Sequence, residues 1–247
     1  MALIANTYYE ERIPETAKLI PEGVVTILDV GCGKGFFLNM LPAKYQRLGL
    51  DSSSEVLRYV KTRTILGNIA KLPFPDRSFD LVTCLEVLEH LPDGVYREAI
   101  NEIERVARKY IILSVPNREN LNQALLECPI CRYRFHLYGH SRSFSALILK
   151  TLFRGFDPLS IKEIGPRSVD TYPQVISLAY GVLTKPRLPE NAVCPRCGYK
   201  EQAAYPINKA GKGYLLYRLL LPLCLMAKLI WRQRNKNQWL LSLYKRR

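Results

Sequence analysis

The amino-terminal end of this sequence lacks the two features of a cleaved signal peptide, a basic start and a sustained apolar stretch. We therefore expect a cytoplasmic protein, whose seven cysteines serve as metal ligands or buried thiols before they form disulfides. Hydrophobic residues make up 48% of the 247 and charged residues 23%, which excludes a mainly disordered or collagen-like chain. There is no internal repeat, and the length predicts one large α/β domain with an appendage or two small domains.

Acidic residues are absent after Glu201, although basic residues continue to the end of the chain. The net charge is 36 − 22 = +14, and because the last segment supplies +10, the first 201 residues carry only +4. A balanced body with a basic tail differs from a uniformly basic nucleic-acid binder. The basic residues of the tail are Lys209, Lys212, Arg218, Lys228, Arg232, Arg234, Lys236, Lys245, Arg246 and Arg247.

The tail, residues 208–247, also holds the most apolar stretch of the chain, Tyr214–Trp231. These 18 residues are at the lower limit for crossing a bilayer, and two basic residues and a proline interrupt them. Because charges inside a spanning helix are costly, we expect a helical segment in the membrane interface, peripheral on the inner face, with Trp231 and Trp239 as anchors. The alternative is a helix that packs on the core and precedes a solvated basic end.

Strand-like and helix-like segments alternate over the first two thirds of the chain, which predicts a doubly wound, mostly parallel sheet. A helix within residues 1–23 is expected to cover the ligand cleft, and the position of a seventh strand is not predicted. The predicted strands are Val24–Val30, Arg47–Leu50, Thr64–Leu66, Phe79–Cys84, Tyr110–Val115 and Leu159–Ile164. The other predicted helices are Phe36–Leu41, Glu55–Lys61 and Ser143–Phe153.

The glycine-rich turn Gly31–Gly35 lacks the spacing of two common phosphate-binding motifs. Phe36 stands where the dinucleotide fingerprint needs its third glycine, and Gly35 stands where a Walker loop needs Ser or Thr. The turn still places backbone N–H groups at the carboxyl edge of the sheet, where a ligand can approach. Asp51 ends the next strand, and a carboxylate there can accept hydrogen bonds from both hydroxyls of a ribose.

Four segments together resemble the class I S-adenosylmethionine-dependent methyltransferases, of the type 11 kind. The segments are Ile27–Gly35, Gly49–Asp51, Gly67–Val82 and Glu86–Leu91. The resemblance covers residues 24–117 strongly and implies a Rossmann-like fold, with residues 24–165 as the S-adenosylmethionine-binding domain. It implies that Asp29 helps to fix the turn, Asp51 binds the ribose, and Asn68, where many relatives have Asp, accepts from the adenine amine. The residues that the resemblance assigns to the cofactor are Asp29, Gly31, Gly33, Gly35, Asp51, Asn68, Ile69, Cys84 and Leu85.

Histidine is scarce, and only His90, His136 and His140 are present. Methyl transfer to a hydroxyl needs a base tuned near neutral pH, and histidine is the usual choice. We expect His140 to act as the base or to orient the acceptor, with His136 and Arg142 lining the substrate pocket; a packing role for His140 is the alternative. His90 belongs to a Glu-x-x-Glu-His pattern expected on one helical face, as a second catalytic candidate or a structural residue. In ubiquinone-pathway O-methyltransferases a similar cluster is implicated in divalent-metal binding, and the resemblance leaves that alternative open.

Four of the seven cysteines form two Cys-Pro-x-Cys pairs that 62 residues separate. Four thiolates suit tetrahedral zinc in a closed structural site, with rubredoxin-like iron as the alternative. The metal would clip the segment after the fifth strand to residues 166–207, which we interpret as a lid over the substrate. The predicted ligands are Cys128, Cys131, Cys194 and Cys197, and the predicted buried thiols are Cys32, Cys84 and Cys224.

An Asn/Asp-Pro-Pro-aromatic motif, typical of exocyclic-amine methylation, is absent after the fourth strand, where Cys84–Val87 stands. Its absence counts against an RNA methyltransferase, although the zinc knuckles and the basic tail fit one. We therefore expect O-methylation of a lipid-linked glycan or another amphipathic small acceptor at the membrane face. RNA methylation and a non-catalytic cofactor-binding scaffold are the alternatives.

Overall fold

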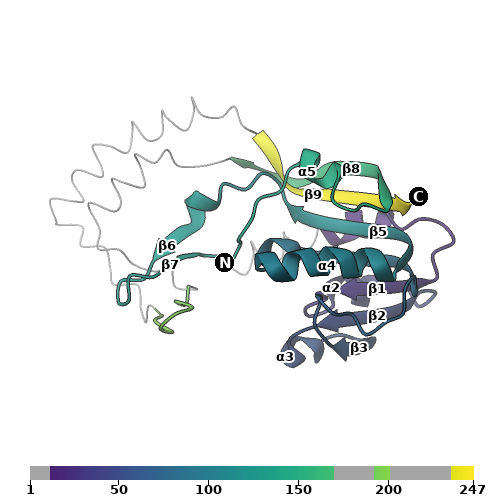
Figure 1. Ribbon diagram of the computed structural model, residues 1–247, viewed down its shortest axis with the longest axis horizontal. Coiled ribbons are helices and arrows are strands. Elements are labelled where there is room, and N and C mark those ends of the chain that lie inside the picture. The colour runs from purple at the N-terminus through teal and green to yellow at the C-terminus, as the bar shows by residue number, and fades with distance from the viewer. Residues whose placement is uncertain (1–11, 170–191, 201–234) are drawn as a thin grey trace. The chain divides into compact units, whose positions relative to one another are not determined.

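The computed structural model describes residues 12–169, 192–200 and 235–247, drawn in colour in Figure 1. The chain divides into two compact units, and each is described by itself. Unit 1 comprises Met1–Glu119, Ser141–Arg167 and Asn237–Arg247, and unit 2 comprises Asn120–His140 and Ser168–Lys236. Unit 2 therefore comes from two insertions into unit 1, and the domain predicted over residues 24–165 stays a prediction.

Unit 1 is built on a seven-stranded sheet of order β3-β2-β1-β4-β5-β9-β8 (Figure 1). The first five strands are parallel, and β9 is antiparallel to β5. Backbone N–H groups of Arg247 and Asn237 bond to Gly155 and to the Glu163 side chain respectively, so β8 is antiparallel to β9. The strands are β1 (Thr26–Val30), β2 (Gln46–Asp51), β3 (Arg63–Leu66), β4 (Phe79–Leu85), β5 (Ala107–Pro116), β8 (Phe156–Val169) and β9 (Asn235–Arg246).

The predicted doubly wound, mostly parallel sheet is confirmed, and the six predicted strands correspond to β1–β5 and β8. A helix over residues 12–18 begins the described part of the chain. The other helices are α2 (Phe36–Met40), α3 (Ser54–Leu57), η1 (Leu88–His90), α4 (Asp93–Val106), η2 (Leu121–Ala124) and α5 (Ala146–Lys150).

Side chains alternate between two buried clusters, as the pleat of a sheet covered on both faces requires. On β1, Leu28 and Val30 belong to one cluster and Ile27 to the other. Helix α4 adds Ala99, Ile103 and Val106 to the first cluster, and all three are fully buried. The two clusters fix the carboxyl edge of the sheet, where β1, β2 and β4 end.

The carboxyl-terminal residues form a sheet strand, not the predicted helical tail. Strand β9 lies beside β5 (Figure 1) and pairs with it from Trp239 to Lys245. Trp239 is only 3% exposed. The predicted membrane anchor at Trp239 is therefore wrong. Its ring needs the bare backbone of Gly165, where an added Cβ would lie 2.3 Å from the indole.

The apolar stretch at residues 214–231, with Trp231, lies outside the described residues, as do residues 170–191 of the predicted lid. Within the described part of the chain, no helix is long and apolar enough to cross a membrane.

Unit 2 contains an antiparallel pair of strands, β6 (Leu125–Glu127) and β7 (Arg134–His136). The first Cys-Pro-x-Cys pair forms the turn between them. A bridge between Val193 and Lys200 closes a similar turn around the second pair. The chain leaves unit 1 after β5 and β8, both of which end at the carboxyl edge of the sheet.

Candidate active site and metal centre

The turn after β1 is held by three glycines that all have positive φ, at 72° for Gly31, 53° for Gly33 and 71° for Gly35. A Cβ on Gly31 would lie 2.4 Å from Val87, and one on Gly35 would lie 2.9 Å from Val60. At Gly33 a Cβ would meet nothing within 4 Å in the part of the chain that the structure describes. The outer glycines therefore permit close packing, whereas the backbone of Gly33 faces open space that a ligand can enter.

Asp51 ties this turn to the end of β2. One carboxylate oxygen accepts the backbone N–H of Gly33 at 2.8 Å, and the other accepts that of Ser53 at 3.0 Å. The side chain is partly exposed, and a carboxylate has about four acceptor positions, so it can accept further hydrogen bonds from a ligand. The predicted ribose-binding position at the end of the second strand is thus next to the open face of Gly33.

The side chain of Asp29 is buried in the sheet, between β1 and β4. It is 3% exposed and accepts a 2.6 Å hydrogen bond from the hydroxyl of Thr83 on β4. Burial raises the pKa of Asp29 to about 7, against the lowering effects of the Thr83 hydrogen bond and the Arg12 charge. This carboxyl therefore joins β1 to β4 below the turn.

The other predicted cofactor residues offer mainly backbone. The side chains of Cys84 and Ile69 are buried in the core, and Leu85 is partly buried at the end of β4. Asn68 is exposed, and its amide oxygen accepts the backbone N–H of Ala70 at 2.9 Å. This oxygen, expected to accept from adenine, is thus already used in a local turn.

The Glu-x-x-Glu-His segment does not form one helical face, so that prediction is wrong. Glu86 has a φ of 57°, and the following helix, η1, begins only at Leu88. The Glu86 carboxylate accepts the Ser114 hydroxyl at 2.7 Å and pairs with Arg12 at 3.2 Å. The amino-terminal helix is thereby fixed to the carboxyl end of β4.

Glu89 was named in the sequence only as part of the Glu-x-x-Glu-His pattern, and its position beside Val87 and Leu88 in an apolar segment was a further signal. Its side chain is fully buried, and within the described residues neither carboxylate oxygen has a hydrogen-bond partner. Burial raises the pKa of Glu89 to about 7, while the charges of Arg12 and Arg142 lower it. Buried carboxyl groups with a raised pKa recur in functional sites, and Glu89 lies close to the edge where the parallel strands end.

The histidines lie in different units. His90 is exposed on η1 in unit 1, whereas His136 and His140 stack in unit 2 with ring centroids 5.1 Å apart. Nδ1 of His136 accepts the backbone N–H groups of Tyr138 at 3.3 Å and His140 at 3.1 Å. His136 therefore holds its own loop, and the acid–base role expected of His140 stays a prediction.

Arg142 braces η1 within unit 1. Its guanidinium donates to the carbonyl oxygen of Leu88 at 2.7 Å and to Asp93 at 2.7 Å, and it lies 4.0 Å from the ring centroid of Tyr96. This side chain positions the segment that carries Glu89, and its predicted contact with an acceptor is untested.

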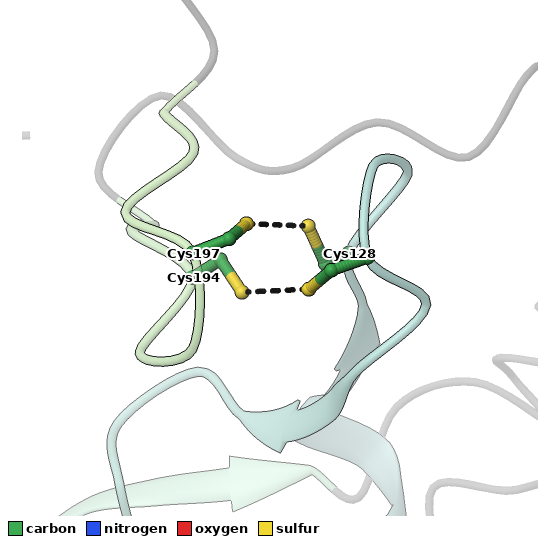
Figure 2. A group of neighbouring side chains, drawn as sticks. Cys128, Cys194 and Cys197 are labelled. Carbon is green, nitrogen blue, oxygen red and sulfur yellow. Dashed lines mark hydrogen bonds between the residues drawn. The ribbon is translucent and has the colours of Figure 1, made fainter.

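The structure brings together the four predicted metal ligands in unit 2 (Figure 2). The sulfurs of Cys128 and Cys197 are 3.6 Å apart, as are those of Cys131 and Cys194, and all four ligand atoms lie within 4.8 Å of one another. A zinc–sulfur length of about 2.3 Å implies tetrahedral sulfurs about 3.8 Å apart. The donor set and its spacing thus fit a tetrahedral ion.

The two knuckles have matching backbone geometry. The N–H of Cys128 donates to Tyr133 and that of Cys194 to Tyr199, at 2.9 Å in both cases. The residue four positions after each first cysteine has positive φ, 59° for Arg132 and 71° for Gly198. The predicted buried thiols Cys32 and Cys84 are confirmed, and Cys224 lies outside the described residues.

The family described as "Methyltransferase domain" matches residues 28–113 of the chain. Residues 28–113 are a class I methyltransferase domain. They contain the glycine turn, Asp51 and η1 described above.

Two curated proteins are similar to parts of this chain. An uncharacterized protein of Methanocaldococcus jannaschii is 41% identical over 151 residues, which cover 56% of this chain and 65% of that protein. A probable S-adenosylmethionine-dependent methyltransferase of Mycolicibacterium smegmatis is 34% identical over 100 residues, covering 37% of this chain and 38% of that protein. The chain thus spans less than two thirds of the length of either relative.

Among solved structures, a methyltransferase from Archaeoglobus fulgidus has the same fold. Its TM-score is 0.56 at 16% sequence identity, and the match covers 95% of this chain and 92% of that one.

The backbone of Gly33 and the carboxylate of Asp51 fit the cofactor that a methyltransferase domain is expected to bind. Among the described residues, no atom lies within 4 Å of a Cβ position on Gly33, and the Asp51 carboxylate bonds to the same residue. An open glycine backbone beside a partly exposed carboxylate suits a nucleoside that lacks a phosphate.

Proposed function

We propose that this chain transfers a methyl group from S-adenosylmethionine. The observation that carries the proposal is the open backbone of Gly33, whose N–H is held by the Asp51 carboxylate. When bound, S-adenosylmethionine supplies a methyl group on a positively charged sulfur, which is already an activated electrophile.

Three parts of the carboxyl edge would hold the cofactor. Asp51 would accept hydrogen bonds from the ribose hydroxyls, and the backbone at Asn68 and Ile69 would face the adenine. The backbone of Cys84 and Leu85 would lie beside the amino acid portion. With both reactants held, alignment supplies much of the rate acceleration.

For the acceptor, we propose O-methylation of a lipid-linked glycan or another amphipathic small molecule at the membrane face. The support is the apolar, basic sequence of residues 208–234, which has no acidic residue. His140 is the proposed base for the acceptor hydroxyl, with His90 as the second candidate. His136 and Arg142 are proposed to flank the acceptor while they hold their own loops.

We propose that one structural zinc ion joins the two insertions of unit 2 through its four cysteines. The support is the sulfur spacing of 3.6 Å and the matching turns of the two knuckles. Because the pairs come from separate insertions, the ion would close unit 2 without taking part in the reaction.

Calorimetry with S-adenosylhomocysteine tests the cofactor assignment. Wild type should bind at one site, and Asp51→Ala should weaken binding at least tenfold, because both the turn and the ribose lose the carboxylate. The control is Asp157→Asn, since Asp157 is exposed and pairs only with Arg247 on the described part of the chain. Equal affinity in wild type and Asp51→Ala would contradict the assignment.

A methyl-transfer assay with labelled donor tests the acceptor. Extract fractions of lipid, glycan and RNA are offered separately to wild type and His140→Ala. Label in an organic-soluble product, lost in the variant, supports the proposal. Label confined to RNA would overturn it and favour the RNA alternative.

A further inference from the structure

A cavity of about 300 Å³ lies in unit 1 at the amino edge of the sheet, away from the glycine turn and Asp51. The last turn of α4 supplies Glu104 and Arg105, and the loop before β4 supplies Asp76 and Arg77. Arg154 enters from the turn after α5, and Arg246 comes from the end of β9. Because β9 is antiparallel to β5, its last residues lie at the edge where β4 and β5 begin.

Two of the four arginines have clear structural roles. Arg105 donates to the Glu102 carboxylate at 2.7 Å and to Asp76 at 2.9 Å. Arg246 donates to the carbonyl oxygens of Glu104 and Ala107, which closes the carboxyl end of α4. These contacts account for Arg105 and Arg246 without a ligand.

The other two arginines have no such role. Within the described residues, neither Arg77 nor Arg154 donates a side-chain hydrogen bond or pairs with a carboxylate, and both are exposed. The neighbouring acids are already engaged. Glu104 accepts the backbone N–H groups of Arg154 at 3.0 Å and Gly155 at 2.7 Å, and Asp76 pairs with Arg105.

The backbone around Arg77 is held firmly while its side chain is displayed. Its φ of 53° is a conformation that costs an L residue free energy. Its N–H donates to Arg105 at 2.8 Å, and its carbonyl oxygen accepts from Arg108 at 2.9 Å. Burial, and to a smaller extent the charge of Arg77, lower the pKa of Arg246, while the charges of Glu104 and Asp76 raise it.

We propose that this cavity binds the diphosphate group of a small soluble ligand through the guanidinium groups of Arg77 and Arg154. Guanidinium groups bind phosphate oxygens in pairs of parallel hydrogen bonds. A volume of about 300 Å³ corresponds to roughly ten waters, which suits a diphosphate and not a length of nucleic acid. The site is separate from the cofactor edge, so it does not rest on the proposed function.

The test is calorimetry with inorganic pyrophosphate at low salt, followed by ADP to ask whether a nucleotide carries the group. Three proteins are compared: wild type, Arg77→Ala/Arg154→Ala, and a control, Arg58→Ala/Arg63→Ala. The control removes two exposed arginines, one directly after α3 and one at the start of β3, so the net charge changes equally. We expect one-site binding by wild type and control, at least tenfold weaker binding by Arg77→Ala/Arg154→Ala, and an affinity that falls with salt.

Thermal unfolding without ligand separates binding from folding. Arg77→Ala/Arg154→Ala should melt at or above the wild-type temperature, because like charges are removed and no hydrogen bond is lost. No pyrophosphate binding by wild type, or equal binding by Arg77→Ala/Arg154→Ala, would overturn the proposal. A lowered melting temperature would also overturn it, because the two arginines would then be structural. Binding of S-adenosylhomocysteine should be the same in all three proteins.

Discussion

At the residue scale, the Asp29 carboxyl carries the clearest electrostatic cost in the sheet. In the unfolded chain it titrates near pH 4, whereas burial raises its pKa to about 7 in the folded chain. Between these values the folded state keeps a proton that the unfolded state has released. The contribution of Asp29 to stability therefore falls as the pH rises through this window.

Asp29→Asn removes this titration and keeps an acceptor for the Thr83 hydroxyl. The variant should match wild type near pH 4 and exceed it at pH 8 by up to roughly 4 kcal/mol in free energy of unfolding. Urea denaturation at pH 4 to 8 measures this, with Asp157→Asn as the exposed control. If the free energy of unfolding of wild type and Asp29→Asn changed with pH in the same way, the raised pKa of Asp29 would be contradicted.

Arg132 and Gly198 occupy the same position in the two knuckles, but only glycine adopts positive φ without cost. Arg132→Gly should therefore raise zinc affinity several-fold, because about 1 kcal/mol of backbone strain is removed. Its exposed ion pair with Glu127 contributes little. Gly198→Ala should lower the zinc affinity. Competition with a chelator measures the zinc affinity of both variants. If both substitutions changed the affinity in the same direction, the two turns would not match.

Single residues were predictable from sequence where the backbone dictates their type. The glycines of the turn and Asp51 follow from the strand–turn–helix pattern. Glu89 is buried, and its carboxylate has no hydrogen-bond partner among the described residues. His136 accepts hydrogen bonds from the backbone of its own loop. Both features depend on tertiary contacts, which the local spacing of residues does not encode.

At the element scale, β9 is the strand that the sequence analysis missed. Its side chains alternate between the two buried clusters, with Leu240 and Tyr244 on one face and Trp239 and Leu241 on the other. Because basic residues flank this alternation, we interpreted the segment as a tail. The parallel strands were easier to predict, since each is a short apolar run followed by a turn.

Trp239→Ala should lower the free energy of unfolding by about 3–5 kcal/mol, because a buried ring packed on Gly165 is lost. Lys245→Ala is the control, since Lys245 is exposed on the same strand and should change stability by less than about 0.5 kcal/mol. Urea denaturation compares them. If Trp239→Ala had the same free energy of unfolding as wild type, Trp239 would not be packed in the fold, and this account of β9 would be contradicted.

At the scale of the whole molecule, the four cysteines are the main feature of the described part of unit 2. Its described hydrophobic cluster contains three buried residues, and two of them are the ligands Cys128 and Cys194. A metal ion or another cross-link would stabilise a cluster of this size. The sequence predicted this pairing across 62 residues because both knuckles have the same pattern.

Cys194→Ser/Cys197→Ser should lose zinc and become sensitive to protease within residues 120–140, while unit 1 still binds S-adenosylhomocysteine. Elemental analysis should find one zinc per wild-type chain purified without chelator, and Cys32→Ser should retain it. Zinc-free wild type, or zinc retained by the double variant, would contradict the four-cysteine site.

The most direct measurement of the central claim is a crystal structure of the full chain with S-adenosylhomocysteine. We predict density for the nucleoside beside Gly33, with both ribose hydroxyls within hydrogen-bond distance of the Asp51 carboxylate. An empty cleft at saturating ligand, or a protein side chain lying over Gly33, would contradict the account.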